Sequence, residues 1–234
     1  SDASAKAAAP PTLDDVQTKT DHRRATRKQA GGNDADWSGV AKDDIITIVS
    51  GLPRSGTSMM MQMIDHGGLP PFTDGAREAD ADNPKGYYEH LKTTQLARDQ
   101  SWLPDAKGKC VKIVAQLLPL LPDDQKYRVI FMDRDLREIA RSQRVMLDRL
   151  GKEGSRLDDV RLMETLDHQV AQIELFMHGR TSIQCLFVNY ADVLNAPAEA
   201  AARLNAFLGG DFDETAMTAA VEPSLRRQRS NEDS

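Results

Sequence analysis

The chain has 234 residues, of which 40% are hydrophobic and 28% are charged, so it is long enough for one globular domain with a buried core. Its formal net charge is −6 and its isoelectric point is about 5.4, and this acidic balance argues against a general binder of nucleic acid or of anionic membranes. No apolar run approaches the roughly 20 residues that cross a bilayer, and the N-terminus lacks the apolar core of a signal peptide. We therefore expect a cytoplasmic protein without a membrane span.

Residues 1–43 form a polar segment with few large apolar side chains. Its start is rich in alanine and proline, a basic patch follows over His22–Lys28, and Gly31 and Gly32 come next. Such a composition cannot bury enough apolar surface to offset the conformational entropy that is lost on ordering. The sequence therefore predicts a flexible N-terminal arm over 1–43, with room for a short helix over about 12–30, and one domain over 44–234.

From residue 45 onwards, apolar runs of strand length alternate with helical segments. The run Ile45–Val49 is β-branched and apolar throughout, as in a central parallel strand that is covered on both faces. Further strands are predicted over 110–114, 128–132 and 183–189, and helices over 57–66, 92–102, 136–150, 158–178 and 197–208. Strands that alternate with helices pair in parallel through right-handed crossovers. We expect an α/β fold of three layers, in which helices flank a central parallel sheet as in P-loop nucleoside triphosphatases.

A glycine-bounded loop over 51–58 joins the first strand to the first helix. The backbone N–H groups of such a loop converge on an anion, and the positive end of the helix dipole adds to the attraction. Gly51 and Gly56 allow backbone angles and close approach that other residues do not, and Thr57 and Ser58 supply hydroxyl donors where the helix begins. This placement between strand and helix predicts a phosphate-binding loop.

The loop departs from the Walker pattern of nucleoside triphosphatases at one position. Gly56 is followed by Thr57, where the Walker pattern has the lysine that reaches the β- and γ-phosphates, and a cation lies inside the loop at Arg54. A nucleoside triphosphatase with this loop would be poorly equipped to neutralise its leaving group. A P-loop kinase or nucleoside triphosphatase nevertheless stays an alternative, because Asp133 ends an apolar strand as a Mg²⁺-binding Walker-B aspartate does. A catalytically silent nucleotide-binding module is another.

The residues Pro53-Arg54-Ser55-Gly56-Thr57-Ser58 resemble the loop with which sulfotransferases bind the 5′-phosphosulfate of 3′-phosphoadenosine-5′-phosphosulfate (PAPS). The arginine is closer to the tyrosylprotein-type and bacterial branches than to the cytosolic branch. The resemblance implies a P-loop architecture, PAPS as co-substrate, and a hydroxyl or amine on a small-molecule or peptidyl acceptor. It implies no catalytic metal, and it leaves the acceptor and the oligomeric state open.

Further stretches of the chain carry the same resemblance. In the family, an arginine at a strand end and a serine eight residues later hold the 3′-phosphate of the donor, and Arg134 and Ser142 have this spacing. Tyr190 resembles a tyrosine that lies near the adenine in some members. The stretch 82–89 is similar to one in bacterial members, and Arg226 and Arg227 belong to a late basic segment that in relatives can fold over the 3′-phosphate.

Sulfuryl transfer needs a cation for the charge that develops on the leaving oxygen. Arg54 is the first candidate. Lys112 is the second, because it lies inside an apolar strand where its charge needs a partner, and it resembles a lysine on the equivalent strand of cytosolic members. The histidine that those members have two residues later is Val114 here, which argues against a histidine base.

The reaction also needs a base for the acceptor proton. Tyrosylprotein-type members use a glutamate in the segment after the first helix, so the resemblance implies that Asp74 or Glu78 is the base, with Asp74 slightly favoured by its distance from that helix. Glu89 and His90 are the reserve candidates. The two cysteines, Cys110 and Cys185, lie in apolar stretches and are predicted to be buried thiols.

Overall fold

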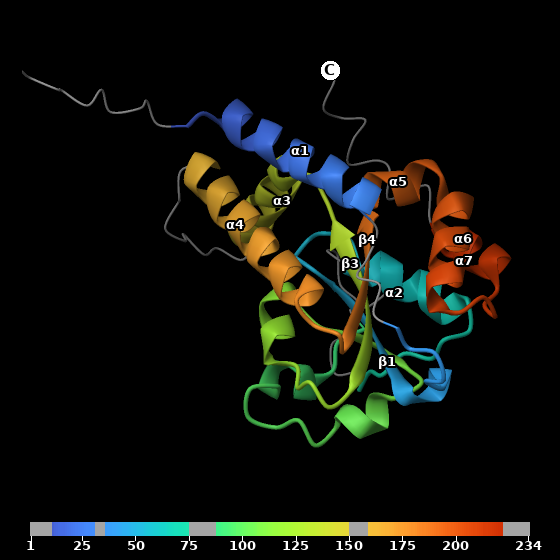
Figure 1. The fold of residues 1–234 in the computed structure, drawn as a ribbon. Coiled ribbons are helices and arrows are strands. Elements are labelled where there is room, and N and C mark those ends of the chain that lie inside the picture. The colour runs from blue at the N-terminus through green and yellow to red at the C-terminus, as the bar shows by residue number, and fades with distance from the viewer. Residues whose placement is uncertain (1–10, 31–35, 75–87, 150–158, 222–234) are drawn as a thin grey trace, which may run out of the picture.

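The computed structural model describes residues 11–30, 36–74, 88–149 and 159–221 (Figure 1). Within these ranges, four strands form one parallel sheet in the order β2-β1-β3-β4. The strands are β1 (Ile45–Gly51), β2 (Cys110–Lys112), β3 (Lys126–Asp133) and β4 (Ile183–Asn189). In this sheet Val49 pairs with both Lys112 and Ile130. The sheet confirms the predicted α/β fold with a central parallel sheet.

Helices cover both faces of this sheet, which gives the three layers that the sequence predicts (Figure 1). The α-helices are α1 (Leu13–Ala30), α2 (Thr57–His66), α3 (Leu136–Arg149), α4 (Asp159–His178), α5 (Tyr190–Asn195), α6 (Pro197–Leu208) and α7 (Glu214–Ala220). Side chains alternate along β1 between two apolar clusters. Ile46 and Ile48 join the cluster on the side of α3 and α4, whereas Val49 joins the methionines of α2.

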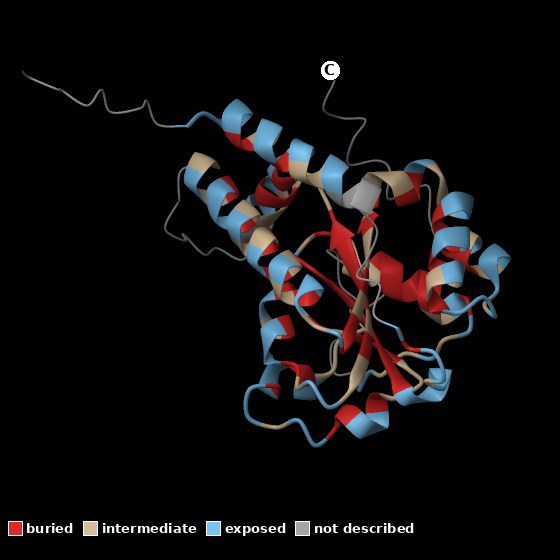
Figure 2. Cartoon of the chain, viewed as in Figure 1, coloured by how far each residue is buried: buried red, intermediate tan, exposed pale blue. Residues whose placement is uncertain are grey.

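Burial explains why β1 lies inside the sheet. All seven of its residues are buried, and Figure 2 shows buried residues along the strands and on the helix sides that face them. The methionines of α2 also lie in this core, where flexible side chains fill the space between the helix and the sheet. The buried central strand therefore leads directly into the glycine-bounded loop.

The segment between α2 and β3 differs from the sequence prediction. A helix was predicted over 92–102, but the chain forms short 3-10 turns there, η2 (Leu91–Gln95) and η3 (Leu103–Ala106), and a further one after β2, η4 (Ala115–Leu120). Asp99 accepts hydrogen bonds from the backbone N–H and the hydroxyl of Ser101, at 2.9 and 2.6 Å, and such bonds favour a turn over a continued helix.

The described part of the N-terminal segment packs on the domain, whereas its composition predicts a flexible arm. The helix expected over about 12–30 is α1, whose Val16 and Thr20 are buried and which contacts α3 and α4. Trp37 is also buried, and its indole N–H donates to the carbonyl of Thr181 at 3.1 Å. After it, η1 (Lys42–Asp44) leads into β1. The domain boundary at residue 44 stays a prediction.

Candidate active site

The loop between β1 and α2 is folded so closely that two of its positions have room only for glycine. A Cβ atom at Gly56 would lie 2.4 Å from Cδ2 of Tyr190, and the φ of Gly56, 98°, lies in the left-handed region that side chains disfavour. A Cβ atom at Gly51 would lie 2.3 Å from Oγ of Ser55 and 2.8 Å from the carbonyl oxygen of Met132. The loop is therefore held against β3 and the start of α5.

Arg134, which directly follows β3, and Ser142 of α3 meet the loop at Arg54. The guanidinium of Arg134 donates to the carbonyl oxygen of Arg54 at 3.0 Å, and Nε of Arg54 donates to Oγ of Ser142 at 2.8 Å. Arg54 itself has a φ of 73°, which is rare for a residue with a side chain. The structure thus brings the arginine–serine pair and the loop into one hydrogen-bonded group.

Tyr190 and Glu138 hold Arg134 in this position. The guanidinium carbon of Arg134 lies 4.4 Å from the centre of the Tyr190 ring, and Nε of Arg134 donates to Glu138 at 2.8 Å. Tyr190 is 7% exposed, and its ring also packs against Gly56. Glu138 was not among the residues predicted from the sequence, although its position four residues after Arg134, on a predicted helix, is a usable signal.

Lys112 supplies a second cation from the edge strand β2. Its ammonium lies 3.3 Å from Oγ of Ser58, at the start of α2, and 3.4 Å from Oε1 of Glu89. The Lys112 side chain is only 10% exposed, and that of Glu89 is 39% exposed. Glu89, one of the candidate acids, therefore contacts Lys112. In the sequence it ranked below Asp74 as a candidate base.

The Asp74 carboxylate is bound to the segment that carries Glu89. Its Oδ2 accepts a hydrogen bond from the backbone N–H of Leu91 at 2.7 Å and lies 3.4 Å from Nδ1 of His90. The His90 ring stacks on Phe72 at 4.5 Å, and Phe72 stacks in turn on the buried Trp102. Asp74 and this aromatic stack fix the backbone next to Glu89. The other candidates, Glu78, Arg226 and Arg227, lie outside the described residues, as does most of the stretch 82–89.

Asp133, the candidate Walker-B aspartate, pairs with an arginine of α1. Nε of Arg24 lies 3.1 Å from Oδ2 of Asp133, which is 8% exposed. Within the described ranges, no group of three or more His, Cys, Asp or Glu side chains is arranged to hold a metal ion. Both cysteines are buried, as predicted, and burial raises the pKa of the Cys110 thiol above its ordinary value.

Comparison with known families identifies the family to which this chain belongs. The profile described as a sulfotransferase domain matches residues 42–232. The chain belongs to the sulfotransferase family. A comparison with curated protein sequences finds no significant match. No helix in the described ranges is both long and apolar enough to span a membrane.

Two solved structures are similar to this sulfotransferase chain. The sulfotransferase domain of the Synechococcus PCC 7002 olefin synthase is 14% identical, with a TM-score of 0.45, and the match covers 81% of this chain and 84% of that one. The sulfotransferase domain of the curacin biosynthetic pathway is also 14% identical, with a TM-score of 0.47 and coverage of 80% and 87%.

Proposed function

We propose that this sulfotransferase moves a sulfuryl group from PAPS to a hydroxyl or amine acceptor. The observation that carries the proposal is the hydrogen-bonded group of Arg54, Arg134 and Ser142. PAPS has two anionic ends, a 5′-phosphosulfate and a 3′-phosphate. A glycine loop beside an arginine–serine pair offers a binding site for each end within one group of contacting residues.

The residues of the loop fit a phosphosulfate group. Because Gly51 and Gly56 have no side chains, neither residue itself blocks an anion from the backbone of the loop. The hydroxyl of Ser55 is fully buried and makes no hydrogen bond with the described residues, so an anion oxygen would give it a partner. We propose that residues 53–58 hold the 5′-phosphosulfate, that Arg134 and Ser142 hold the 3′-phosphate, and that Tyr190 lies near the adenine.

For the chemical step, we propose Glu89 as the base and Lys112 as the cation. The Glu89 carboxylate takes the proton of the acceptor, the acceptor atom forms a bond to sulfur, and the bond between sulfur and the bridging oxygen breaks. The negative charge then lies on the 5′-phosphate of 3′,5′-adenosine bisphosphate, where Lys112 and Arg54 stabilise it. This assignment follows the contact of Lys112 with both Ser58 and Glu89. Asp74 would act by positioning the backbone at residues 90 and 91.

A titration separates this function from that of a P-loop kinase or nucleoside triphosphatase. Isothermal titration calorimetry with 3′,5′-adenosine bisphosphate in the presence of EDTA is compared with a titration with ATP and Mg²⁺. We expect the bisphosphate to bind without metal and more tightly than ATP with Mg²⁺. The opposite preference, with a requirement for Mg²⁺, would overturn the proposal and favour a metal role for Asp133.

A transfer assay separates an enzyme from a silent nucleotide-binding module. The protein is incubated with [³⁵S]PAPS and a panel of phenols, carbohydrates, amines and tyrosine peptides, and labelled products are separated by chromatography. We expect labelling of at least one acceptor class and its loss in the Lys112→Ala variant. Tight binding of the bisphosphate with no labelled product in any class would favour the silent module.

A further inference from the structure

The helix α1 lies before the residues that match the family, yet it reaches the donor side of the proposed site. Figure 1 shows α1 running across the carboxyl ends of β3 and β4. Two of its side chains bind the residues on either side of Arg134. Nε of Arg24 lies 3.1 Å from Asp133, and Nε2 of Gln17 donates to Oδ2 of Asp135 at 2.7 Å.

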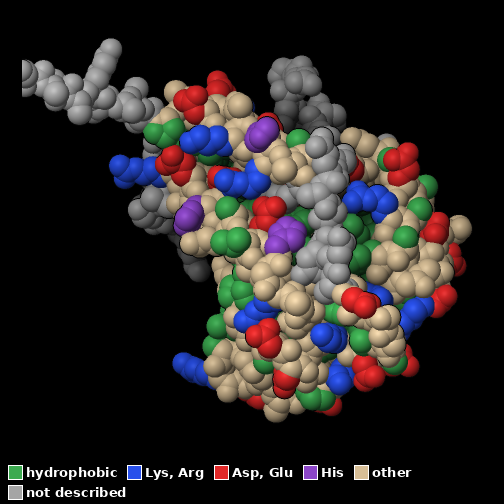
Figure 3. Space-filling view, in the orientation of Figure 1, with side chains coloured by type: hydrophobic (Ala, Val, Ile, Leu, Met, Phe, Trp, Pro, Cys, Tyr) green, Lys and Arg blue, Asp and Glu red, His purple; other side chains and the backbone are tan. Residues whose placement is uncertain are grey.

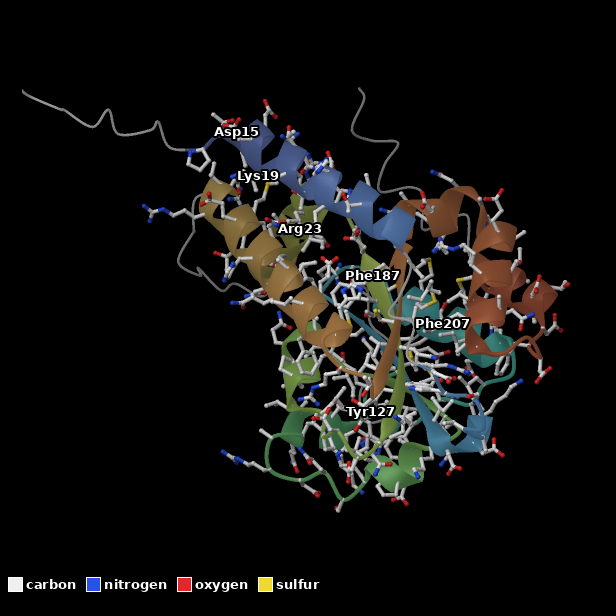
Figure 4. The ribbon with its side chains drawn as sticks, viewed as in Figure 1. Asp15, Lys19, Arg23, Tyr127, Phe187 and Phe207 are labelled. Carbon is white, nitrogen blue, oxygen red and sulfur yellow. The ribbon has the colours of Figure 1, made fainter. Side chains whose placement is uncertain are left out.

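Several contacts of α1 with the domain are ion pairs or hydrogen bonds. Besides the contacts of Arg24 and Gln17, Arg23 pairs with Asp167 of α4, and Arg137 of α3 pairs with Asp14. Figure 3 shows basic and acidic side chains lying together over α1 and α4, and Figure 4 shows Arg23 on α1 beside α4. Among the apolar residues of α1 with described side chains, Val16 is the buried one. Salt screens exposed charge pairs such as Arg137 with Asp14, so we expect the docking of α1 to weaken as the ionic strength rises.

Acidic side chains outnumber basic ones in a cavity that α1 lines. The cavity has a volume of about 180 Å³ and lies between the second half of α1 and the ends of β3 and β4. Three carboxylates line it, from Asp21, Asp133 and Asp192, with two guanidinium groups, from Arg24 and Arg203. Without Arg24, three carboxylates would face one arginine next to the strand end that carries Arg134. Such an excess of negative charge opposes the binding of an anion nearby.

We infer that Arg24 and Gln17 of α1 are positioning residues of the donor site. Arg24 offsets the charge of Asp133, and together with Gln17 it fixes the turn from β3 to α3 that presents Arg134 to the 3′-phosphate. The N-terminal segment therefore sets the affinity of the domain for its nucleotide, and it does so in a salt-dependent way. This inference rests on the proposed binding of PAPS.

The test measures binding of 3′,5′-adenosine bisphosphate to the full chain by calorimetry at low and at high salt. We expect Arg24→Ala to weaken binding about five- to tenfold at low salt and by less at high salt. The control is Lys19→Ala, which removes the same charge from the exposed face of α1 and changes the affinity by less than about twofold. Thermal unfolding of each variant shows that it is folded at the temperature of the titration.

A double variant distinguishes the charge effect from a loss of structure. In Arg24→Ala/Asp133→Asn the neutral amide no longer opposes the anion, so affinity returns to within about twofold of the wild type. Affinity of Arg24→Ala equal to that of the wild type, or a double variant as weak as Arg24→Ala, would overturn the inference. If the wild-type chain itself binds no bisphosphate, the result contradicts the proposed function. If every variant binds it equally well, only the role of α1 fails.

Discussion

The proposed donor side and the proposed acceptor side of the site are built in different ways. On the donor side, a single loop runs from a fully buried strand into a helix, and Arg134 and Ser142 contact it at 3.0 and 2.8 Å. On the acceptor side, Lys112 comes from an edge strand and Glu89 from a segment without regular strands, and they meet at 3.4 Å. We therefore expect the proposed donor site to be a preformed frame and the proposed catalytic pair to be more adjustable. Substitutions on the first side should change nucleotide affinity, and those on the second should change turnover.

The largest effect is expected for Glu89→Gln, on the acceptor side. Loss of the proposed base should lower kcat about 1,000-fold, while the Kd of 3′,5′-adenosine bisphosphate changes by less than about twofold. Asp74→Asn is the matched control, because it removes a neighbouring carboxylate that binds the backbone, and it should lower kcat about tenfold. Both are measured by [³⁵S]sulfate transfer at saturating donor. A full rate in Glu89→Gln with a large loss in Asp74→Asn would return the role of base to Asp74.

On the donor side, Gly56→Ala should weaken binding of the bisphosphate about 100-fold. The added Cβ would lie 2.4 Å from the Tyr190 ring, which itself supports Arg134. Gly68→Ala is the control, since Gly68 has a similarly positive φ of 106° with no atom within 4 Å of the added Cβ. Calorimetry on both variants separates the clash from backbone strain. Equal affinities would show that the close contact does not shape the nucleotide site.

The arginine–serine pair should divide its contribution unequally. Arg134→Ala removes a cation and should weaken bisphosphate binding about 30-fold, whereas Ser142→Ala removes a neutral hydroxyl and should weaken it about fivefold. Arg144→Ala, on the same helix as Ser142, removes an exposed arginine that pairs with Asp159 and serves as the control. An Arg134→Ala variant no weaker than Arg144→Ala would remove the 3′-phosphate from this position.

The smallest effect concerns alkaline stability on the acceptor side. Burial and the neighbouring Asp65 raise the pKa of Tyr88 to about 12, against about 10 in an unfolded chain. Between these values the unfolded chain has released the proton and the folded chain has kept it, so the free energy of unfolding falls as the pH rises from about 10 to about 12. Tyr88→Phe should therefore lose less stability than the wild type across this range. Urea denaturation at several alkaline pH values measures the slope, and equal slopes would contradict burial of Tyr88.

Local spacing explains which parts of the fold and of the site are predictable. The loop over 51–58 is recognisable because strand, glycines and helix follow one another, and the eight-residue spacing of Arg134 and Ser142 lies within one strand–helix unit. The contact of Lys112 with Glu89 depends on the path of the chain through short 3-10 turns, where a helix was predicted. The contact between Glu89 and Lys112 could therefore not be predicted from the residues next to either of them in the sequence.

The packing of α1 on the domain is hard to read from the sequence for a different physical reason. Composition measures how much apolar surface a segment can bury, and by that measure residues 1–43 are a flexible arm. The pairing of Arg24 with Asp133 joins residues 109 positions apart, and charge complementarity over such a distance leaves no pattern in one sequence. A polar helix can therefore dock on a domain through its ion pairs while its composition resembles that of a disordered segment.

The burial of both cysteines has a practical consequence. Maleimide reagents react with the thiolate form of cysteine. Cys110 is buried and its pKa is raised, so almost none of it is in the thiolate form. The native chain can therefore serve directly as the background for site-specific labelling. A cysteine introduced at Lys19 would carry a fluorophore on the exposed face of α1, and its emission would report in real time whether the N-terminal helix leaves the domain during turnover.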